Sequence, residues 1–173
     1  DILFRMAQNS CPYVNKNNID TIECSNDIVY DEKLPNVCKL DFYRVKSNEK
    51  QPAVILIHGG GFIAGDKKYR KGRSQYFAIN GFAVFSINYG LAPDYIFPDP
   101  LMHIINAANY IYDHADEYNI DTDRIFVDGD SAGGYYAAML AAFNCSAKLK
   151  ESFGIAPKFK IFGALFNCGV YDM

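Results

Sequence analysis

Two glycine-rich segments constrain this chain most, because each comes directly after a short run of apolar and β-branched residues. They read His58-Gly59-Gly60-Gly61-Phe62, after residues 53–57, and Gly129-Asp130-Ser131-Ala132-Gly133-Gly134, after residues 124–127. Glycine permits the tight turns and close backbone approaches that occur where a strand passes into a helix. Both segments are therefore predicted to follow strands, and the second is predicted to be a sharp strand-to-helix turn.

The apolar pattern along the chain alternates between the signatures of strands and helices. Nearly continuous apolar runs, which are typical of buried parallel strands, lie at residues 53–57, 82–87, 125–127 and 159–166. Helical stretches separate them at residues 69–80, 101–118 and 132–143. This order predicts an α/β fold with a mostly parallel sheet and helices on both faces.

The first third of the chain has a different character. Residues 21–30 and 37–45 alternate between apolar and polar around a turn at residues 33–36, which predicts an antiparallel pair of strands at an edge of the sheet. An apolar stripe near the N-terminus predicts a helix or cap segment within residues 1–18. No linker divides the chain, so residues 1–173 are expected to form one domain, incomplete for the reasons given below.

The composition is that of a globular protein with a substantial core. Half of the 173 residues are apolar, and the formal net charge is −3. A nucleic-acid-binding surface needs a basic surplus, so none is expected. The basic residues Lys67, Lys68, Arg70, Lys71 and Arg73 are predicted to form the solvated start of a helix, with a phosphate- or membrane-facing patch as the alternative. No run of 18 apolar residues and no signal peptide is visible, so no membrane span is expected, although the chain opens at Asp1 and a removed leader stays an alternative. A cytoplasmic location is predicted from the cysteines described next.

The five cysteines give no sign of a metal site. Cys11, Cys24, Cys38, Cys145 and Cys168 form no C-x-x-C pair and no cluster with histidine. They are predicted to be reduced, as in a cytosolic protein, although one disulfide among the first three remains open. Neither a metal nor a cofactor is expected.

Ser131 is the candidate nucleophile. A free serine is a weak nucleophile, and it needs an exposed position, a base and stabilisation of the negative charge that develops. Gly129 and Gly133 flank Ser131 where a tight turn would leave no room for a Cβ. The N-terminus of the following helix and the N–H of Ala132 would favour a developing oxyanion. The alternative is an ordinary glycine-rich turn that binds phosphate.

The run from His58 to Gly61 offers a second set of donors. Three successive glycines allow backbone N–H groups to turn inward without obstruction, and Gly60 and Gly61 are the candidate donors of an oxyanion hole. His58 is predicted to brace this loop by hydrogen bonding rather than to act as a base. A phosphate cradle is the rival interpretation, but the Lys-Ser/Thr of a P-loop does not follow.

Taken together, these motifs resemble those of the hormone-sensitive-lipase-like esterases, a family of α/β-hydrolases. The resemblance runs from about residue 53 to residue 145 and rests on the two glycine-rich motifs, on residues 88–93 with Phe97 and Pro98, and on residues 119–125. It implies that Ser131 is the nucleophile and that Gly60, Gly61 and Ala132 supply the oxyanion hole. It also implies hydrolysis of carboxylic esters without a cofactor.

Four residues depart from the family pattern. Gly90 stands where relatives usually carry Arg, and His103 stands where an Asp is common. Tyr135 and Tyr136 replace the more usual Asn-Leu. These departures concern the acyl pocket and the fine specificity, not the reaction class.

The acid and base that such a serine requires are not evident. In this fold they follow the serine in the order Asp/Glu, then His. Residues 132–173 contain no histidine, and their acids are Glu151 and Asp172. Asp172 follows the predicted strand 159–166, one strand too early for the triad acid, and is predicted to be structural. Neither His103 nor His114 is expected to be the base, because both belong to the helix before the nucleophile.

The sequence therefore predicts an α/β-hydrolase-type domain that stops before its last strands. A further segment, either a second chain or a continuation of this one, would carry the acid and the histidine. The favoured function is ester hydrolysis through an acyl-enzyme on Ser131. The alternatives are an inactive hydrolase fold used as a binding module, an amidase or formamidase, or an esterase for acetylated or feruloylated sugars.

Overall fold

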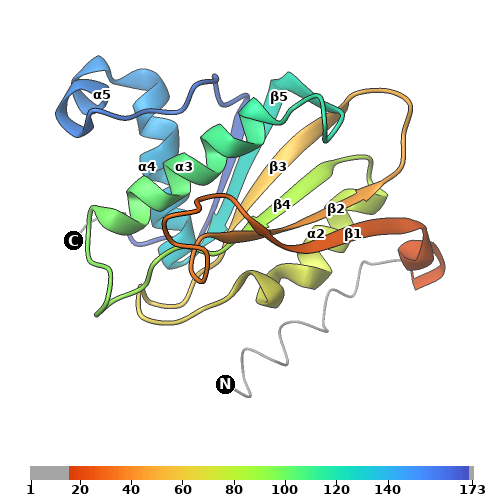
Figure 1. The fold of residues 1–173 in the computed structure, drawn as a ribbon, viewed down its shortest axis with the longest axis horizontal. Helices are drawn as coiled ribbons and strands as arrows, with labels where there is room; N and C mark the ends of the chain where they lie inside the picture. Colours follow the sequence, from red (N-terminus) through yellow and green to blue (C-terminus); the bar gives the residue numbers. More distant parts are fainter. Residues whose placement is uncertain (1–15, 172–173) are drawn as a thin grey trace.

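The computed structural model describes residues 16–171 (Figure 1). The predicted N-terminal helix therefore lies outside the described residues, as do Cys11 and Asp172. In chain order, the elements are η1 (Lys16–Thr21), β1 (Ile22–Val29), β2 (Lys39–Val45), β3 (Gln51–Ile57), η2 (Lys67–Arg70), α2 (Lys71–Ile79), β4 (Ala83–Ile87), α3 (Asp99–Asp113), β5 (Ile120–Asp130), α4 (Ala132–Cys145), α5 (Ala147–Phe153) and β6 (Gly163–Asn167).

The strands form one sheet in the order β1-β2-β4-β3-β5-β6. The pairs β1–β2 and β2–β4 are antiparallel, whereas β4–β3, β3–β5 and β5–β6 are parallel. The predicted antiparallel edge pair and the predicted mostly parallel sheet are both confirmed. Because β3, β4, β5 and β6 run in the same direction, their carboxyl ends lie along one edge of the sheet.

Alternate residues of the central strands pack against different helices. In β3, Ile55 and Ile57 belong to the larger core, which is completed by apolar residues of α3 and α4. Val54 and Leu56 belong to a smaller core on the opposite face, together with Ala78 of α2. Helices therefore cover both faces of the central strands, as predicted, with α3 and α4 on one side and α2 on the other (Figure 1).

The outermost strand β6 is much less covered than the central strands. Leu165 and Phe166 are 41% and 43% exposed, and Phe162, just before the strand, is 63% exposed. Within residues 16–171, β6 pairs with β5 alone. One side of this strand is thus free to accept a further partner.

Several boundaries differ from those predicted. Strand β5 begins at Ile120 rather than near residue 125, because a register shift after Pro52 inserts residues 122–124 as a bulge. Strand β6 begins at Gly163, so residues 159–162 form a loop, and α3 ends at Asp113 instead of continuing to residue 118. Helix α5, which Ser146 caps through a side-chain hydrogen bond to Leu149 N–H, was not predicted.

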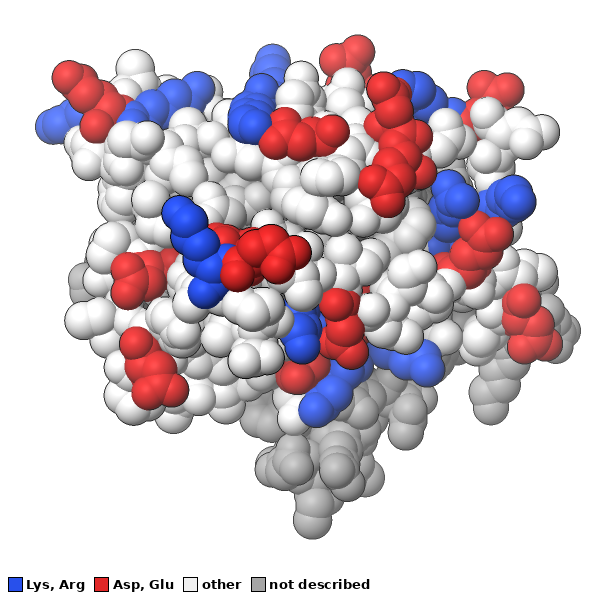
Figure 2. Space-filling view, viewed as in Figure 1, with Lys and Arg blue, Asp and Glu red and all other residues white. Residues whose placement is uncertain are grey.

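The basic residues at 67–73 do begin a helix, as predicted, but they are only partly solvated, because acidic side chains pair with four of the five. Lys67 is buried, and its Nζ lies 2.8 Å from Asp27 and 2.7 Å from Asp41. Figure 2 shows basic and acidic side chains interspersed over one face of the molecule. This pairing also removes the basis for the alternative, a phosphate- or membrane-facing patch.

Among residues 16–171, the four cysteines Cys24, Cys38, Cys145 and Cys168 are free thiols. No helix in residues 16–171 is both long and apolar enough to span a membrane. The same residues contain no group of three or more potential His, Cys, Asp or Glu metal ligands.

Candidate active site

Ser131 occupies a strained turn between β5 and α4. Its φ of 51° and ψ of −121° are unusual for a residue with a side chain, and such a conformation costs about 1–3 kcal/mol. Two hydrogen bonds hold it there. Ser131 N–H donates to the carbonyl of Asn167 in β6 at 2.8 Å, and the Ser131 carbonyl accepts from Tyr135 N–H at 3.1 Å. The neighbouring strand and the first turn of α4 thus fix the position of a half-buried serine.

Close packing explains the glycines on both sides of this serine. A methyl group on Gly129 would lie 2.2 Å from the carbonyl oxygen of Gly133, and one on Gly133 would lie 2.1 Å from that of Ile57. Both distances are far below van der Waals contact, so α4 can begin this close to β3 and β5 only when these positions lack a Cβ.

The glycine-rich loop after β3 makes an equally unusual turn. Gly60 has a φ of 142°, Gly61 a φ of 62° and Phe62 a φ of 67°. The carbonyl of Gly60 accepts hydrogen bonds from Ile63 N–H at 3.3 Å and Ala64 N–H at 3.0 Å, which closes the loop on itself. The loop is therefore an ordered turn.

The two motifs meet at the carboxyl edge of the sheet. Strands β3 and β5 are neighbours, and Ile57 is the register partner of Gly129. A methyl group on Gly59 would lie 2.6 Å from the carbonyl oxygen of Asp130 and 3.1 Å from the Cβ of Ser131. The loop therefore begins in direct contact with the serine turn, although the contacting residues Gly59 and Asp130 are 71 positions apart in the sequence.

The candidate oxyanion donors are unpaired in the described part of the chain. Neither Gly60 N–H nor Gly61 N–H donates to an acceptor there, and the same holds for Ala132 N–H, the first amide of α4. The first amides of a helix have no partner within it, and they carry a partial positive charge. The Ser131 hydroxyl also has no hydrogen-bond partner among residues 16–171. The site can therefore offer a nucleophilic oxygen and several donors to a ligand.

His58 lies beneath the glycine loop in the interior. It is 1% exposed, and its ring stacks on Tyr89 with 4.5 Å between the centroids. Burial lowers the pKa of His58 to about 4, so the imidazole is neutral near pH 7. Its Nδ1 lies 2.9 Å from the carbonyl oxygen of Gly59 and must carry the proton, because a carbonyl can only accept. The hydroxyl of Tyr89 donates to the carbonyl of His58 itself at 2.6 Å. These contacts join His58 to the loop, and its role as a brace stays a prediction.

An ion pair borders the serine, and the sequence did not reveal this pair. Arg70 Nε lies 2.7 Å from Asp130 Oδ1, and Arg70 Nη2 lies 2.5 Å from Asp130 Oδ2. Arg73 pairs in the same way with Asp128, whose Oδ1 also accepts from Asn167 Nδ2 at 2.8 Å. Burial raises the pKa of Asp128, and Arg73 partly offsets this effect. The two arginines thus tie the start of α2 to the end of β5.

A spacing signal for these pairs exists in the sequence. Two arginines three positions apart at the start of a helix face two aspartates two positions apart at the end of a strand. The sequence does not say, however, that this helix packs against this strand, so the signal could be used only with the topology known.

Two of the departures from the family pattern lie together. Gly90 N–H donates to His103 Nδ1 at 3.2 Å, and the Tyr95 ring meets the His103 ring edge-to-face at 5.2 Å. A methyl group on Gly90 would lie 2.5 Å from Cγ of Tyr95. The space that a larger side chain at position 90 would need is therefore filled by Tyr95.

The other histidine and acid considered as partners of Ser131, His114 and Glu151, belong to other parts of the fold. His114 caps the end of α3, where its Nδ1 lies 2.8 Å from the carbonyl of Tyr110. Glu151 is an exposed residue of α5. The structure thus offers no base for Ser131 from these residues.

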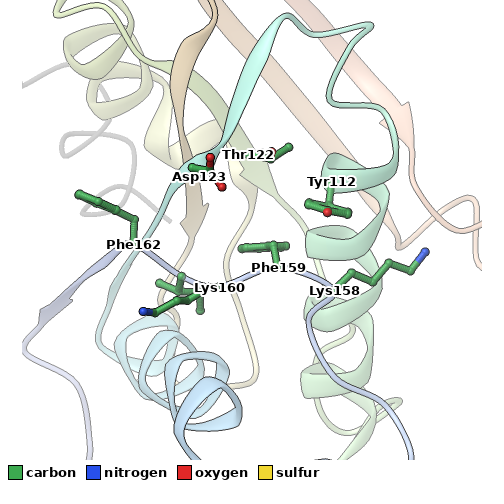
Figure 3. A pocket seen from close by; sticks show the side chains of 8 residues that line it. Tyr112, Thr122, Asp123, Lys158, Phe159, Lys160 and Phe162 are labelled. Carbon is green, nitrogen blue, oxygen red and sulfur yellow. The ribbon is translucent and has the colours of Figure 1, made fainter.

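Among the cavities of the described residues, two lie at opposite ends of the parallel strands. The larger has a volume of about 530 Å³ and lies where β5 begins and just before β6, at the amino ends of these strands. Figure 3 shows Thr122 and Asp123 on one side of it, with Lys158 and Lys160 on the other. The second cavity, of about 400 Å³, lies at the carboxyl edge. It contains Phe62 of the glycine loop and Tyr135 of the first turn of α4.

The sheet order, the strained serine after β5 and the glycine loop after β3 define the chain as an α/β-hydrolase-type fold. It belongs to the BD-FAE family, whose profile matches residues 40–171. Among solved structures, esterase B from Lactobacillus rhamnosis superposes with a TM-score of 0.80 at 26% identity, over 94% of this chain and 54% of that one. A bacterial heroin esterase superposes with a TM-score of 0.71 at 28% identity, over 91% and 46%.

Curated relatives agree with this assignment. Esterase LipI of Mycobacterium tuberculosis is 37% identical over 91 residues, which cover 52% of this chain and 28% of LipI. An acetyl esterase of Salmonella paratyphi B is 35% identical over 92 residues, which cover 53% and 27%. The chain spans about a third of the curated relatives or less, and about half of the solved structures.

Proposed function

We propose that the protein hydrolyses carboxylic esters through an acyl-enzyme on Ser131. The observation that carries this proposal is the strained Ser131 turn in contact with the glycine loop, where the N–H groups of Gly60, Gly61 and Ala132 have no partner among residues 16–171. The esterases to which the chain is similar support the same reaction class.

The chemistry requires a base, a nucleophile and an oxyanion hole. Ser131 Oγ attacks the ester carbonyl carbon while its proton passes to a histidine, and the carbonyl oxygen becomes an oxyanion. N–H groups of Gly60, Gly61 and Ala132 hold this oxyanion, each contributing about 3 kcal/mol. The C–O bond to the alcohol then breaks, and the histidine returns the proton to the leaving oxygen. Water, activated by the same histidine, releases the acid and regenerates the serine.

We place the triad acid and histidine in a further segment of the same fold, either a continuation or a second chain. Residues 132–173 hold no histidine, and the known structures that resemble this chain are about twice as long. The exposed strand β6, with Leu165 and Phe166 uncovered, is the edge that such a segment would extend.

The test is the substitution Ser131→Ala in the full-length protein, assayed on a short-chain nitrophenyl ester. We expect turnover to fall by about 10⁴-fold or more, because the acyl-enzyme cannot form. Ser25→Ala, at an exposed position of β1, is the matched control and should keep full activity. Undiminished turnover by the Ser131→Ala protein would refute the assignment.

The same experiment separates the alternatives. A full-length protein that turns over amides faster than matched esters would be an amidase. One that cleaves only acetylated or feruloylated sugars would be a carbohydrate esterase. Complete inactivity, together with no covalent labelling of Ser131, would favour a binding module. The prediction of a cytoplasmic protein is independent of these outcomes and stays a prediction.

A further inference from the structure

Lys67, at the far end of the glycine loop, is a lysine in the interior of the protein. It is the first residue of η2, the element that follows the loop, and it is 6% exposed. Lysine is almost never buried to this degree unless its charge is paired. The position of Lys67 is therefore set by the groups that meet its ammonium and its backbone.

The ammonium lies between two carboxylates from the antiparallel part of the sheet. Lys67 Nζ lies 2.8 Å from Asp27 Oδ1 and 2.7 Å from Asp41 Oδ1. Asp41 is a buried residue of β2, and its Oδ1 also accepts from Asp27 N–H at 2.9 Å. Asp27 has a φ of 59° at an irregularity of β1, which brings both its N–H and its carboxylate to this ion pair. Burial lowers the pKa of Lys67, but hydrogen bonds to the two carboxylates outweigh this effect and raise the pKa above its usual value, so the ammonium is charged near pH 7.

The backbone of Lys67 is held by β4 and by the residue that follows this strand. Lys67 N–H donates to Asn88 Oδ1 at 2.6 Å, and the Lys67 carbonyl accepts from Ser86 Oγ at 3.0 Å. Ser86 is a fully buried residue of β4, and Asn88 comes directly after β4 ends. Lys67 is thus joined to three neighbouring strands, to β1 and β2 through its ammonium and to β4 through its backbone.

The same short segment after β4 also holds the other end of the glycine loop. Tyr89, which follows Asn88, donates from its hydroxyl to the carbonyl of His58 at 2.6 Å. Two consecutive residues therefore hold both ends of the loop, and the candidate donors Gly60 and Gly61 lie between these ends at positive φ. Because glycine has many accessible conformations, the held ends restrict which conformation the loop adopts.

A buried ion pair of this kind fixes a position more than it adds stability. The cost of removing the charges from water offsets much of their attraction, so apolar side chains of similar size are often as favourable. A buried ammonium that leaves its acceptors is strongly unfavourable, however, so Lys67 is confined to one place. Catalysis needs such precision, because a displacement of about 1 Å can reduce the rate about 100-fold.

We propose that Lys67 is a positioning residue of the oxyanion hole. Its ammonium, held by Asp27 and Asp41, fixes the end of the glycine loop, and the loop then directs the N–H groups of Gly60 and Gly61 towards the ester oxygen. The role is indirect, because Lys67 acts through the loop and not on the substrate. The proposal rests on the proposed function, since it assumes that these amides receive the oxyanion.

The first test is Lys67→Met in the full-length protein, which removes the ammonium and keeps the length of the side chain. On a short-chain nitrophenyl ester we expect kcat to fall about 30-fold with KM within about twofold, because displaced donors matter mainly in the transition state. A trifluoromethyl ketone adds to the serine and leaves its oxygen in the oxyanion hole, so it should bind about 30-fold more weakly. Unchanged kcat and unchanged ketone affinity in folded Lys67→Met protein would overturn the proposal.

Ile120→Ala separates a positioning role from a general loss of stability. Ile120 is fully buried at the start of β5, at the opposite edge of the sheet from the glycine loop, and alanine there lowers the Tm by leaving a cavity. Its kcat should stay within about twofold of the unmodified enzyme at a temperature at which both variants are folded. Equal losses of kcat in Ile120→Ala and Lys67→Met would assign the effect to destabilisation and overturn the proposal.

A milder pair of variants tests the same link if Lys67→Met does not fold. Asn88→Ala removes the acceptor of Lys67 N–H, whereas Asn88→Asp keeps an oxygen at that place. We expect kcat to fall about 10-fold in Asn88→Ala and to lie within about threefold of the unmodified enzyme in Asn88→Asp, with little change of KM in either. An unchanged kcat in Asn88→Ala would contradict the link between Lys67 and the loop.

A spectroscopic measurement distinguishes a failure of this proposal from a failure of the proposed function. In heteronuclear NMR spectra of the glycine-labelled full-length protein, Lys67→Met should shift the amide signals of Gly60 and Gly61. The signal of Gly154, at the end of α5, is the control and should not move. Unmoved Gly60 and Gly61 signals would overturn the positioning proposal even if no ester is cleaved. Shifted signals in a protein whose unmodified form cleaves no ester would contradict the proposed function alone.

Discussion

The cavities at the two ends of the sheet differ in size, and the smaller one lies at the edge that carries the features of a reactive site. The larger cavity lies at the amino ends of β5 and β6 and is bordered by charged, solvated side chains, among them Lys158 and Lys160. Lys158 pairs with Asp113 at 2.5 Å, and both side chains are about half exposed. Asn119, just before β5, also has a positive φ of 52°, but its side chain is satisfied by hydrogen bonds to the carbonyls of Ser47 and Glu49.

The carboxyl edge shows the opposite combination. Ser131 and Phe62 are held at positive φ, three amide groups have no acceptor within residues 16–171, and the ion pair of Arg70 with Asp130 borders the serine. Strain of this kind persists only where surrounding contacts impose it. The difference teaches why the proposed chemistry is assigned to the carboxyl edge: a strained serine lies there beside unpaired amide groups, whereas the larger cavity has volume alone.

After Ser131→Ala itself, the largest effect is expected from Gly60→Ala. The new methyl group would lie 1.7 Å from the carbonyl oxygen of Ala64, and the φ of 142° is closed to alanine, so the loop must move. We expect kcat in the full-length enzyme to fall by about 100- to 1,000-fold, the loss associated with an oxyanion donor.

Gly154→Ala is the matched control for this substitution. Gly154 has a φ of 63° at the end of α5, and an added methyl group meets open space there. Activity should be unchanged, with a stability loss of about 1 kcal/mol. Equal kcat values for Gly60→Ala and the unmodified enzyme would show that the glycine loop has no part in the reaction.

The next effect concerns the pH dependence of stability. The folded-state pKa of His58 is about 4, below the value of about 6.5 expected in the unfolded chain, so the unfolded state binds more protons between these pH values. Above about pH 6.5, neutral His58 makes its full contribution to the free energy of unfolding. About 3 kcal/mol of this free energy is lost as the pH falls to 4.

Urea unfolding of the full-length protein at pH 4.5 and pH 7 measures this loss. His58→Asn should flatten the pH dependence, because asparagine can donate to the Gly59 carbonyl without titrating. His114→Asn, at the opposite end of the sheet, is the control and should retain the dependence of the unmodified protein. If His58→Asn leaves the pH dependence unchanged, the buried neutral histidine is not its origin.

A smaller effect is expected from Arg70→Gln. This change leaves the Asp130 carboxylate uncompensated beside Gly59 and close to the site where the oxyanion develops. We expect kcat to fall by about 10-fold with little change in KM, since the repulsion acts mainly on the transition state.

The double variant Arg70→Gln with Asp130→Asn should recover much of this loss, because no bare charge remains. Lys158→Gln breaks the ion pair beside the larger cavity and should leave kcat unchanged. No recovery in the double variant would mean that the arginine acts through packing rather than through charge.

The smallest effect is expected at the larger cavity itself. Lys160→Ala removes a charged side chain from its wall, and kcat/KM should stay within about twofold of the unmodified enzyme. A loss comparable to that of Arg70→Gln would contradict the contrast between the two ends of the sheet, because it would place function at the amino ends of the strands.

Much of the fold could be predicted from local sequence patterns. The apolar runs that became β3 and β4 are continuous because both of their faces are buried. The glycines around Ser131 predicted that the strand and the helix approach each other closely. The order of these patterns was enough to predict a mostly parallel sheet with an antiparallel edge pair.

The rest depends on contacts between distant segments. The bulge at residues 122–124 follows from pairing with Gln51 and Pro52, which no local pattern encodes. Lys67 looks like a solvated side chain in the sequence, yet it is buried because Asp27 and Asp41 reach it from β1 and β2. The cavity at the carboxyl edge likewise unites residues from three separate segments, so its composition became visible only in the structure.

The most direct test of the account is covalent labelling of the full-length protein with a fluorophosphonate, followed by peptide mass spectrometry. Labelling requires an activated serine next to an oxyanion hole. The account predicts one phosphonyl adduct, on Ser131, which is abolished by prior heat unfolding. An adduct on another residue, or an unmodified Ser131 in active protein, would contradict it.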